Sequence, residues 1–398
     1  MREHGTHVST LDGVRGLAVL LVMLYHFAHV DLVSELPADR LFYRLAMTGW
    51  IGVDLFFALS GFLITGILLR SKEASRYFGV FYGRRALRIF PLYYGYLALL
   101  FWVIFPLVSH HGVGDERAKA EAVQASWPWF VLYLSNIKQT FAGVFFGAGA
   151  GHLWSLAIEE QFYVIWPLVI RYLPVAVVRR VCLVLLPLAL VLRIGMAASG
   201  VSADTIWVFT LARLDGLLAG ALLAIAVQRG LVFEGWLMRG MPLAFVTLVC
   251  GLAVMGGHVE SSPWIYTVGL TVVALVAVGL VYTAYGSQRH PLFSHPALTF
   301  LGKYSYALYV LHPLVREAAV KALGTPRLLF GSQIPWQIAF SAACLAASVL
   351  MALLSWHLLE KRFHRWKEVF FSYREPGDFQ TLQRSSRAAE NGSASTLH

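Results

Sequence analysis

The sequence contains few charged residues and few cysteines. Only 14% of its 398 residues are charged, whereas a soluble domain carries about a quarter. This scarcity, together with 58% hydrophobic residues, excludes an ordinary soluble enzyme and predicts an all-α polytopic membrane protein. The three cysteines (Cys182, Cys250 and Cys344) lie in separate apolar runs and have no pairing pattern. No cysteine–histidine set has zinc-site spacing, so we expect neither a disulfide nor a metal.

The formal net charge of +10 comes from basic residues that cluster in short segments beside apolar runs. Membrane orientation produces this distribution. A nucleic-acid-binding surface would instead interleave basic residues with aromatic ones, and no stretch does so. We therefore expect membrane lipid, and no nucleic acid, as a partner. No internal repeat is visible, which weakens a transporter interpretation based on inverted halves.

Apolar runs of about 17 to 25 residues can cross a bilayer. Ten runs qualify: Val14–Val30, Gly49–Leu69, Ile89–Val108, Ser155–Leu173, Val178–Ala197, Ile206–Gln228, Met241–Gly257, Trp264–Tyr285, Leu298–Leu323 and Gln337–Leu359. The segment Trp127–Thr140 is short and polar, and we predict that it does not cross. Asp12 and Arg15 interrupt the first run, so we do not expect it to be a cleaved signal peptide.

Basic residues between the first spans predict the orientation. The segment Arg70–Arg88 holds six of them and is expected to be a cytoplasmic loop, which places both termini in the cytoplasm. We predict one membrane domain over residues 1–370. The remaining residues, 371–398, are rich in Ser, Arg, Gln and Ala and are expected to form a disordered cytoplasmic tail.

The first span carries ionisable residues on one helical face. The eleven-residue step from Arg15 to His26 returns nearly to the same face, roughly 16 Å further along, and Asp12 lies on the same stripe. Ionisable groups inside a membrane are costly and indicate a functional site. His26 can accept a proton from a hydroxyl, and Arg15 can hold an anionic group. The alternative is that Asp12 and Arg15 lie among headgroups while His26 bonds a neighbouring helix.

Arg84, Arg85 and Arg88 form a compact cationic cluster at the entry to a span, and the last two share a helix face. Guanidinium groups bind phosphate well, so the cluster is a candidate donor-binding site. Anchoring to anionic lipid is the alternative.

A second polar stripe starts at His152 and continues through Ser155 and Glu159, with Glu160 beside it. An acidic pair within an apolar run needs partners. We expect this stripe to contribute to catalysis or to substrate binding. A structural salt bridge from Glu159 to Arg15 or Arg213 is the alternative.

Other polar residues lie within predicted spans and are candidate substrate-binding groups: Asp54, Ser60, Arg213, Asp215, Ser305, Tyr309 and His312. The last three form one helical face at steps of four and three. The structural alternatives are an ion pair between Arg213 and Asp215, and a buried, hydrogen-bonded His312.

Seven of these segments follow, in order, the motifs of the acyltransferase type 3 family of membrane acyltransferases, which the chain resembles from about Leu11 to Phe363. They are LDGVRGLAVLLVMLYH, GVDLFFALSGFLIT, RRALRIFPLYY, HLWSLAIEEQFYVIWP, RLDGLLAG, LGKYSYALYVLHP and WHLLEKRF. The resemblance implies a fold of about ten membrane helices. It also implies acetyl-CoA or another acyl-CoA as donor, and a glycan, glycolipid or similar hydroxyl acceptor. A bacterial inner (cytoplasmic) membrane is the expected location.

The resemblance also assigns residues. It places the family's arginine–histidine motif on Arg15 and His26, its paired-arginine motif on Arg85 and Arg88, and its glutamate on Glu159. On this basis His26 is the expected general base, and Glu159 orients the histidine or a sugar hydroxyl. Many relatives carry an extracytoplasmic hydrolase-like domain, and this chain has no segment long enough for one, so direct transfer is implied.

Several alternatives stay open. The acceptor can be a small secondary metabolite such as a macrolide, and the acyl group can pass through a covalent acyl-histidine. A non-catalytic polytopic transporter or partner protein would also place charged residues at mid-membrane.

Overall fold

The computed structural model describes residues 8–28, 32–111, 115–142, 146–147, 149–231, 235–287, 289–324 and 326–371. Within these ranges the regular elements are helices, apart from one isolated bridge between Leu329 and Ser332. The predicted tail, 371–398, lies outside the described residues except for Phe371.

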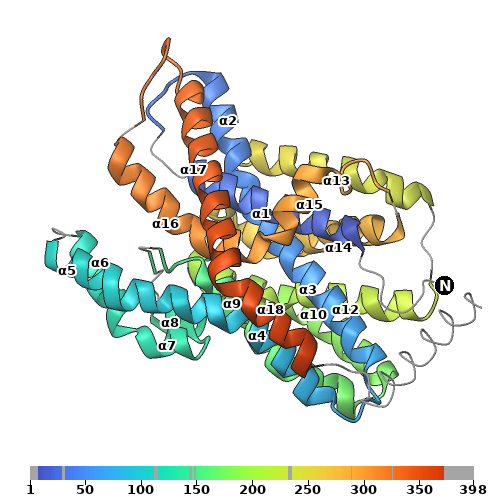
Figure 1. The fold of residues 1–398 in the computed structure, drawn as a ribbon. Helices are drawn as coiled ribbons and strands as arrows, with labels where there is room; N and C mark the ends of the chain where they lie inside the picture. The colour runs from blue at the N-terminus through green and yellow to red at the C-terminus, as the bar shows by residue number, and fades with distance from the viewer. Residues whose placement is uncertain are drawn as a thin grey trace, which may run out of the picture.

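Figure 1 shows the helices as one bundle, with α5 to α8 gathered at one side. The α-helices are α1 (Ser9–Ala28), α2 (Pro37–Met47), α3 (Gly52–Arg70), α4 (Tyr77–Leu99), α5 (Phe105–His111), α6 (Asp115–Ala125), α7 (Trp127–Val131), α8 (Ser135–Ala142), α9 (Leu153–Tyr172), α10 (Val175–Ala198), α11 (Ala203–Val208), α12 (Leu214–Gln228), α13 (Gly235–Val254), α14 (Leu270–Gly286), α15 (Pro296–Lys303), α16 (Ser305–Leu323), α17 (Ile334–Ser355) and α18 (Lys361–Phe370). Short 3₁₀ or π turns are η1 (Thr48–Ile51), η2 (Leu100–Ile104), η3 (Thr210–Arg213), η4 (Val259–Ser261), η5 (Ile265–Gly269) and η6 (Trp356–Glu360).

Eight helical segments among the described residues are long and apolar enough to cross a membrane, which confirms the all-α polytopic class. They are Ser9–Ala28, Pro37–Arg70, Tyr77–His110, Leu153–Tyr172, Val175–Ala198, Thr210–Gln228, Ile265–Gly286 and Ile334–Trp366. Two of the ten predicted spans are not in this set. The described part of the seventh gives a shorter apolar helix, Arg239–Val254. The ninth is divided at Tyr304 into α15 and α16, and α16 carries three charged residues in its second half.

The prediction that Arg70–Arg88 is a loop is wrong from Tyr77 onward. Helix α4 begins at Tyr77, so Arg84, Arg85 and Arg88 belong to a helix that is itself a candidate span. The sequence predicts a loop for these arginines because a charged side chain exposed to lipid is costly. In the folded chain Arg85 and Arg88 line a pocket instead, which removes that objection.

The segment Trp127–Thr140 is not among the candidate spans, as predicted. It forms the short helices α7 and α8, and Asn136 on α8 bonds to neighbouring segments. The Asn136 side chain donates to the Val208 carbonyl over 3.1 Å and accepts from Gln161 over 2.9 Å. These bonds fasten α8 to α9 and to the end of α11.

Two glycines on α1 bring its backbone into contact with α15 and with the segment just before α15. A Cβ atom on Gly13 or Gly16 would lie 1.9 Å from a carbonyl oxygen of Phe293 or Leu298. Gly302 on α15 is equally close to α1, because a Cβ there would lie 1.8 Å from the Asp12 carbonyl oxygen. Small residues allow membrane helices to approach this closely. The contact sets Arg15, between the two glycines, beside the start of α16.

Candidate active site

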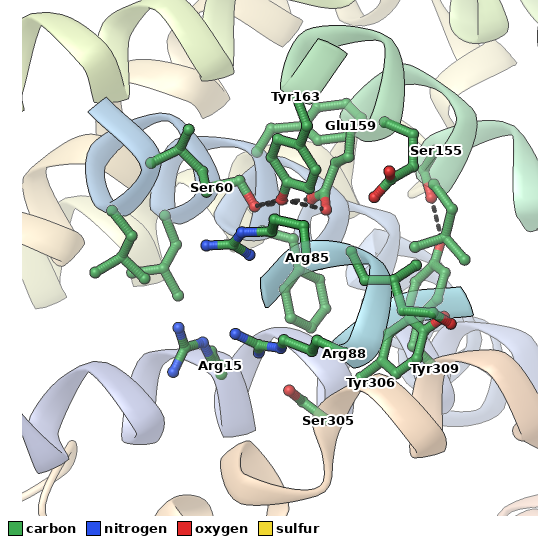
Figure 2. A pocket seen from close by; sticks show the side chains of 18 of the residues that line it. Arg15, Ser60, Arg85, Arg88, Ser155, Glu159, Tyr163, Ser305, Tyr306 and Tyr309 are labelled. Atoms are coloured by element: carbon green, nitrogen blue, oxygen red, sulfur yellow. Dashed lines mark hydrogen bonds between the residues drawn. The ribbon is translucent and has the colours of Figure 1, made fainter. Parts of the chain in front are cut away.

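A pocket within the bundle is lined by three arginines, Arg15 from α1 and Arg85 and Arg88 from α4, and we call it the arginine pocket (Figure 2). The volume of the cavity is about 90 Å³. Its other lining residues come from α3, α4, α9 and α16: Val53, Phe56, Phe57, Leu59, Ser60, Leu63, Ile64, Ile89, Ser155, Leu156, Glu159, Glu160, Tyr163, Ser305, Tyr306 and Tyr309. Five helices from distant parts of the sequence therefore build one polar cavity.

Glu159 is held on the wall that faces these arginines. One carboxylate oxygen accepts a hydrogen bond from the Ser60 hydroxyl and the other from the Tyr163 hydroxyl, each over 3.0 Å. Figure 2 shows the three side chains as one connected group beside Arg85. Bonds from α3 and from the next turn of α9 thus fix the direction of the carboxylate. Glu160 lines the same pocket.

The three arginines differ in their partners. Arg15 forms an ion pair with Asp12 over 2.6 Å, one turn away on α1. The Arg85 guanidinium lies 5.2 Å from the ring centroid of Tyr163, within cation–π range. Neither Arg85 nor Arg88 forms an ion pair with a carboxylate of the described residues. The pocket therefore presents positive charge that is free to bind an anion.

Tyr309 closes one end of the arginine pocket. Its hydroxyl lies 2.5 Å from the Ser155 hydroxyl and donates to the His152 carbonyl over 3.2 Å. Tyr306, on the same helix, donates to the Ile89 carbonyl over 2.8 Å, which ties α16 to the arginine-bearing helix α4. Ser305, Tyr309 and Ser155 thus line the arginine pocket, whereas His152 and His312, which belong to the same two predicted stripes, do not.

A second pocket lies beyond Tyr309, and we call it the histidine pocket because His26 and His152 line it. Val53 and Tyr309 line both pockets. The remaining wall of the histidine pocket is largely aromatic and glycine-rich: Val22, Tyr25, Trp50, Phe146, Gly147, Gly149, Gly151, Trp154, Trp207, Pro313, Arg316 and Glu317. His26 is therefore not in the same pocket as the arginines, and Tyr309 separates the two.

His312 packs behind His26. Its Nε2 atom lies 3.2 Å from Nδ1 of His26, and the ring centroids are 4.8 Å apart. The His152 ring lies 5.7 Å from that of His312. The three predicted histidines, which are widely spaced in the sequence, thus meet at one place.

Three predicted substrate-binding residues lie outside the lining of both pockets, in buried ion pairs. Arg213 bonds Asp54 over 3.1 Å, and Arg193 bonds Asp215 over 2.8 Å. Each of these side chains is at most 1% exposed. The predicted ion pair between Arg213 and Asp215 is wrong. Arg213 pairs with Asp54 from α3, and Asp215 pairs with Arg193 from α10. The alternative of a salt bridge from Glu159 to Arg15 or Arg213 is likewise not formed.

Arg193 and Tyr163 are polar residues that the sequence analysis missed. Arg193 is the single charged residue in the apolar stretch that follows Arg180 on α10, and this is the signal that could have identified it. Tyr163 follows Glu159 by four residues, which places it on the same helical face. Arg84, by contrast, was predicted to bind the donor but donates to the Phe371 carbonyl over 2.7 Å and does not line the arginine pocket.

Among the residues that the structure describes, no group of three or more histidine, cysteine or acidic side chains is arranged to hold a metal ion.

Comparison with known proteins adds three observations. The family model described as "Acyltransferase domain" matches residues 8–363. The candidate peptidoglycan O-acetyltransferase YrhL of Bacillus subtilis is 29% identical over 383 residues, covering 90% of this chain and 55% of the relative. The peptidoglycan O-acetyltransferase OatA of Listeria monocytogenes is 28% identical over 386 residues, covering 92% and 57%. The chain thus spans little more than half the length of these relatives. No solved structure matches it.

Proposed function

The chain belongs to this acyltransferase family, and from that premise we propose that it is an integral-membrane O-acyltransferase. It transfers an acyl group, with acetyl the expected one, from acyl-CoA to a hydroxyl of a carbohydrate or glycoconjugate. The observation that carries the proposal is the pair Arg85 and Arg88, which line a pocket opposite Glu159 without an ion-pair partner among the described residues. The peptidoglycan acetyltransferases named above support a glycan acceptor.

In this proposal the arginine pocket receives the donor. Coenzyme A carries phosphate groups, and guanidinium groups bind phosphate through charge-assisted, often bidentate, hydrogen bonds. The pocket accordingly opens toward the cytoplasm, where acyl-CoA is found, and both termini lie on that side. Residues 1–370 act as one catalytic membrane domain.

The histidine pocket receives the acceptor. The acyl end of the donor passes Tyr309, which lines both pockets, and meets the acceptor near His26. The acceptor hydroxyl gives its proton to His26 while its oxygen bonds to the thioester carbonyl carbon. The carbon–sulfur bond then breaks, and the leaving thiolate takes the proton from His26. Glu159, held by Ser60 and Tyr163, contributes negative charge to the wall of the arginine pocket that faces the arginines.

The test is transfer by purified protein in lipid vesicles. Acetyl-CoA and cell-envelope glycan fragments are supplied, and thiol release and the mass gain of the glycan are measured. We expect His26→Ala to lower transfer by on the order of 10³-fold, because general bases contribute about 10² to 10⁴-fold. The matched control is His357→Ala, which removes an exposed histidine outside both pockets and leaves the rate unchanged. Near-wild-type turnover by folded His26→Ala would refute the role of His26. Thiol release that never requires an acceptor would refute the transferase function.

A further inference from the structure

The histidine cluster is built by two helices and the turn before a third. His26 lies on α1, His312 on α16, and His152 directly before α9. His312 is completely buried, whereas His26 is half-buried and lines the histidine pocket. The buried ring therefore contacts His26 from behind, on the side away from the pocket.

Two backbone carbonyls determine where the ring protons lie. Nδ1 of His26 is 2.8 Å from the Val22 carbonyl oxygen, and Nδ1 of His312 is 3.0 Å from the Leu308 carbonyl oxygen. A carbonyl oxygen only accepts hydrogen bonds, so each of these nitrogens must carry a proton. Both contacts are to the residue one helical turn earlier, and the backbone of each helix therefore holds them in place.

The contact between the two rings follows from this. In a neutral imidazole one nitrogen donates and the other accepts, so Nε2 of His312 carries a lone pair. It lies 3.2 Å from Nδ1 of His26, which shares its proton between Nε2 of His312 and the Val22 carbonyl. The lone pair of a neutral His26 is then on its Nε2 atom.

We propose that His312 is a positioning residue that, together with the Val22 carbonyl, holds His26 in the Nδ1–H tautomer, so that Nε2 is the atom that accepts the acceptor's proton. The inference rests on the proposed function, in which His26 is the general base. When His26 gains a proton, its Nδ1–H still points at two acceptors, which stabilise the positive charge. Carboxylates often perform this role beside catalytic histidines. Here a buried neutral imidazole performs it.

A structural role would make a different prediction. If His312 only filled space between α1 and α16, any side chain of similar size would preserve turnover. If it positions His26, a replacement must also supply a hydrogen-bond acceptor. The comparison of His312→Leu with His312→Gln separates the two, because only the glutamine side chain has an oxygen that can accept from His26.

We expect His312→Leu to lower kcat by on the order of 10²-fold with the KM for acetyl-CoA unchanged, and His312→Gln to recover most of the loss. The matched control is Val310→Ala, a fully buried change on the same helix that lowers thermal stability but leaves kcat per folded molecule unchanged. Equal turnover by the leucine variant, or equal losses in the leucine and glutamine variants, would overturn the positioning role.

A spectroscopic readout does not depend on activity. In ¹⁵N-histidine-labelled protein at pH 8, subtracting the spectra of His26→Ala and His312→Gln assigns the two rings. Both are expected as Nδ1–H tautomers in the unchanged protein, and in His312→Leu part of His26 is expected to convert to the Nε2–H tautomer. A proton on Nε2 of either ring in the unchanged protein, or an unchanged His26 tautomer in His312→Leu, would overturn the inference. The failures are distinguishable. Full turnover by His26→Ala refutes the proposed function, while loss in His26→Ala together with normal kcat in His312→Leu refutes only the role of His312.

Discussion

The arginine pocket and the buried ion pairs both place arginines inside candidate membrane spans, but they treat the charge in opposite ways. Arg213 and Arg193 each face an aspartate, and all four side chains are at most 1% exposed. Arg85 and Arg88 line a cavity and have no ion pair among the described residues. Paired arginines that are fully buried serve helix packing, whereas arginines that line a cavity without an ion pair are placed to bind a ligand.

The ion pair between Arg213 and Asp54 also holds the helix α3, which lines the arginine pocket. Asp54 lies on α3, less than two turns before Ser60, which bonds Glu159. Arg213 fastens this turn of α3 to the start of α12, and its guanidinium lies 4.2 Å from the Trp207 ring centroid. The structural charges therefore hold in place the helix that orients Glu159.

The largest effect is expected on acetyl-CoA binding, at Arg85 and Arg88, which have no ion pair among the described residues. The double change of Arg85→Ala with Arg88→Ala removes two charge-assisted hydrogen-bond donors, each worth about 1.5 to 3 kcal/mol. Acetyl-CoA binding measured by calorimetry should weaken by about 10² to 10⁴-fold, with little change in thermal stability. Unchanged donor affinity would show that these arginines bind something else.

The next largest effect concerns stability. Arg213→Ala leaves Asp54 buried and uncompensated, which we expect to cost about 3 to 5 kcal/mol of unfolding free energy. Removing both charges, as Asp54→Leu with Arg213→Met, should recover most of that loss, because a buried pair can be replaced by apolar residues. Thermal denaturation of the purified variants measures both. Equal losses in the single and double variants would contradict a structural pairing.

A smaller effect is expected at the wall that faces the arginines. Glu159→Gln keeps one oxygen that can accept from Ser60 or Tyr163 but removes the charge beside Arg85. We expect transfer to fall by about 10 to 100-fold, or roughly 1.4 to 2.7 kcal/mol, while acetyl-CoA still binds. The control is Ser60→Ala, which removes one bond and should lose less. Full transfer by Glu159→Gln would show that its charge is not needed.

The smallest effect is expected at Arg84, which lies beside Arg85 on the same helix. Arg84 belongs to the same basic cluster as Arg85 but bonds the Phe371 carbonyl outside the pocket. Arg84→Ala should change acetyl-CoA affinity by less than about 0.5 kcal/mol, as surface substitutions usually do. If Arg84→Ala weakened acetyl-CoA binding as much as Arg85→Ala, all three arginines of the cluster would attract the donor through their combined positive charge.

Much of the candidate site was predictable because residues three or four positions apart lie on the same face of a helix in the folded chain. Arg85 and Arg88, and likewise Ser155 and Glu159, share a face in the sequence and line one pocket in the structure. Arg84 precedes Arg88 by one helical turn, but its guanidinium bonds the Phe371 carbonyl and does not line the pocket, which the spacing could not predict. The start of α4 was misplaced because charge counting assumes that an arginine near a span lies outside it.

Sequence alone determined the class of fold, the family resemblance and the faces on which polar residues lie, since these depend on composition and on a helical period that every turn repeats. Tertiary structure alone decided the partners. Arg213 pairs with Asp54 rather than with Asp215, and His26 meets His312 in a pocket separated from the arginines by Tyr309. Such partners come from helices more than a hundred residues apart, and only the packing of those helices, through contacts such as Gly13 and Gly302, brings them within bonding distance.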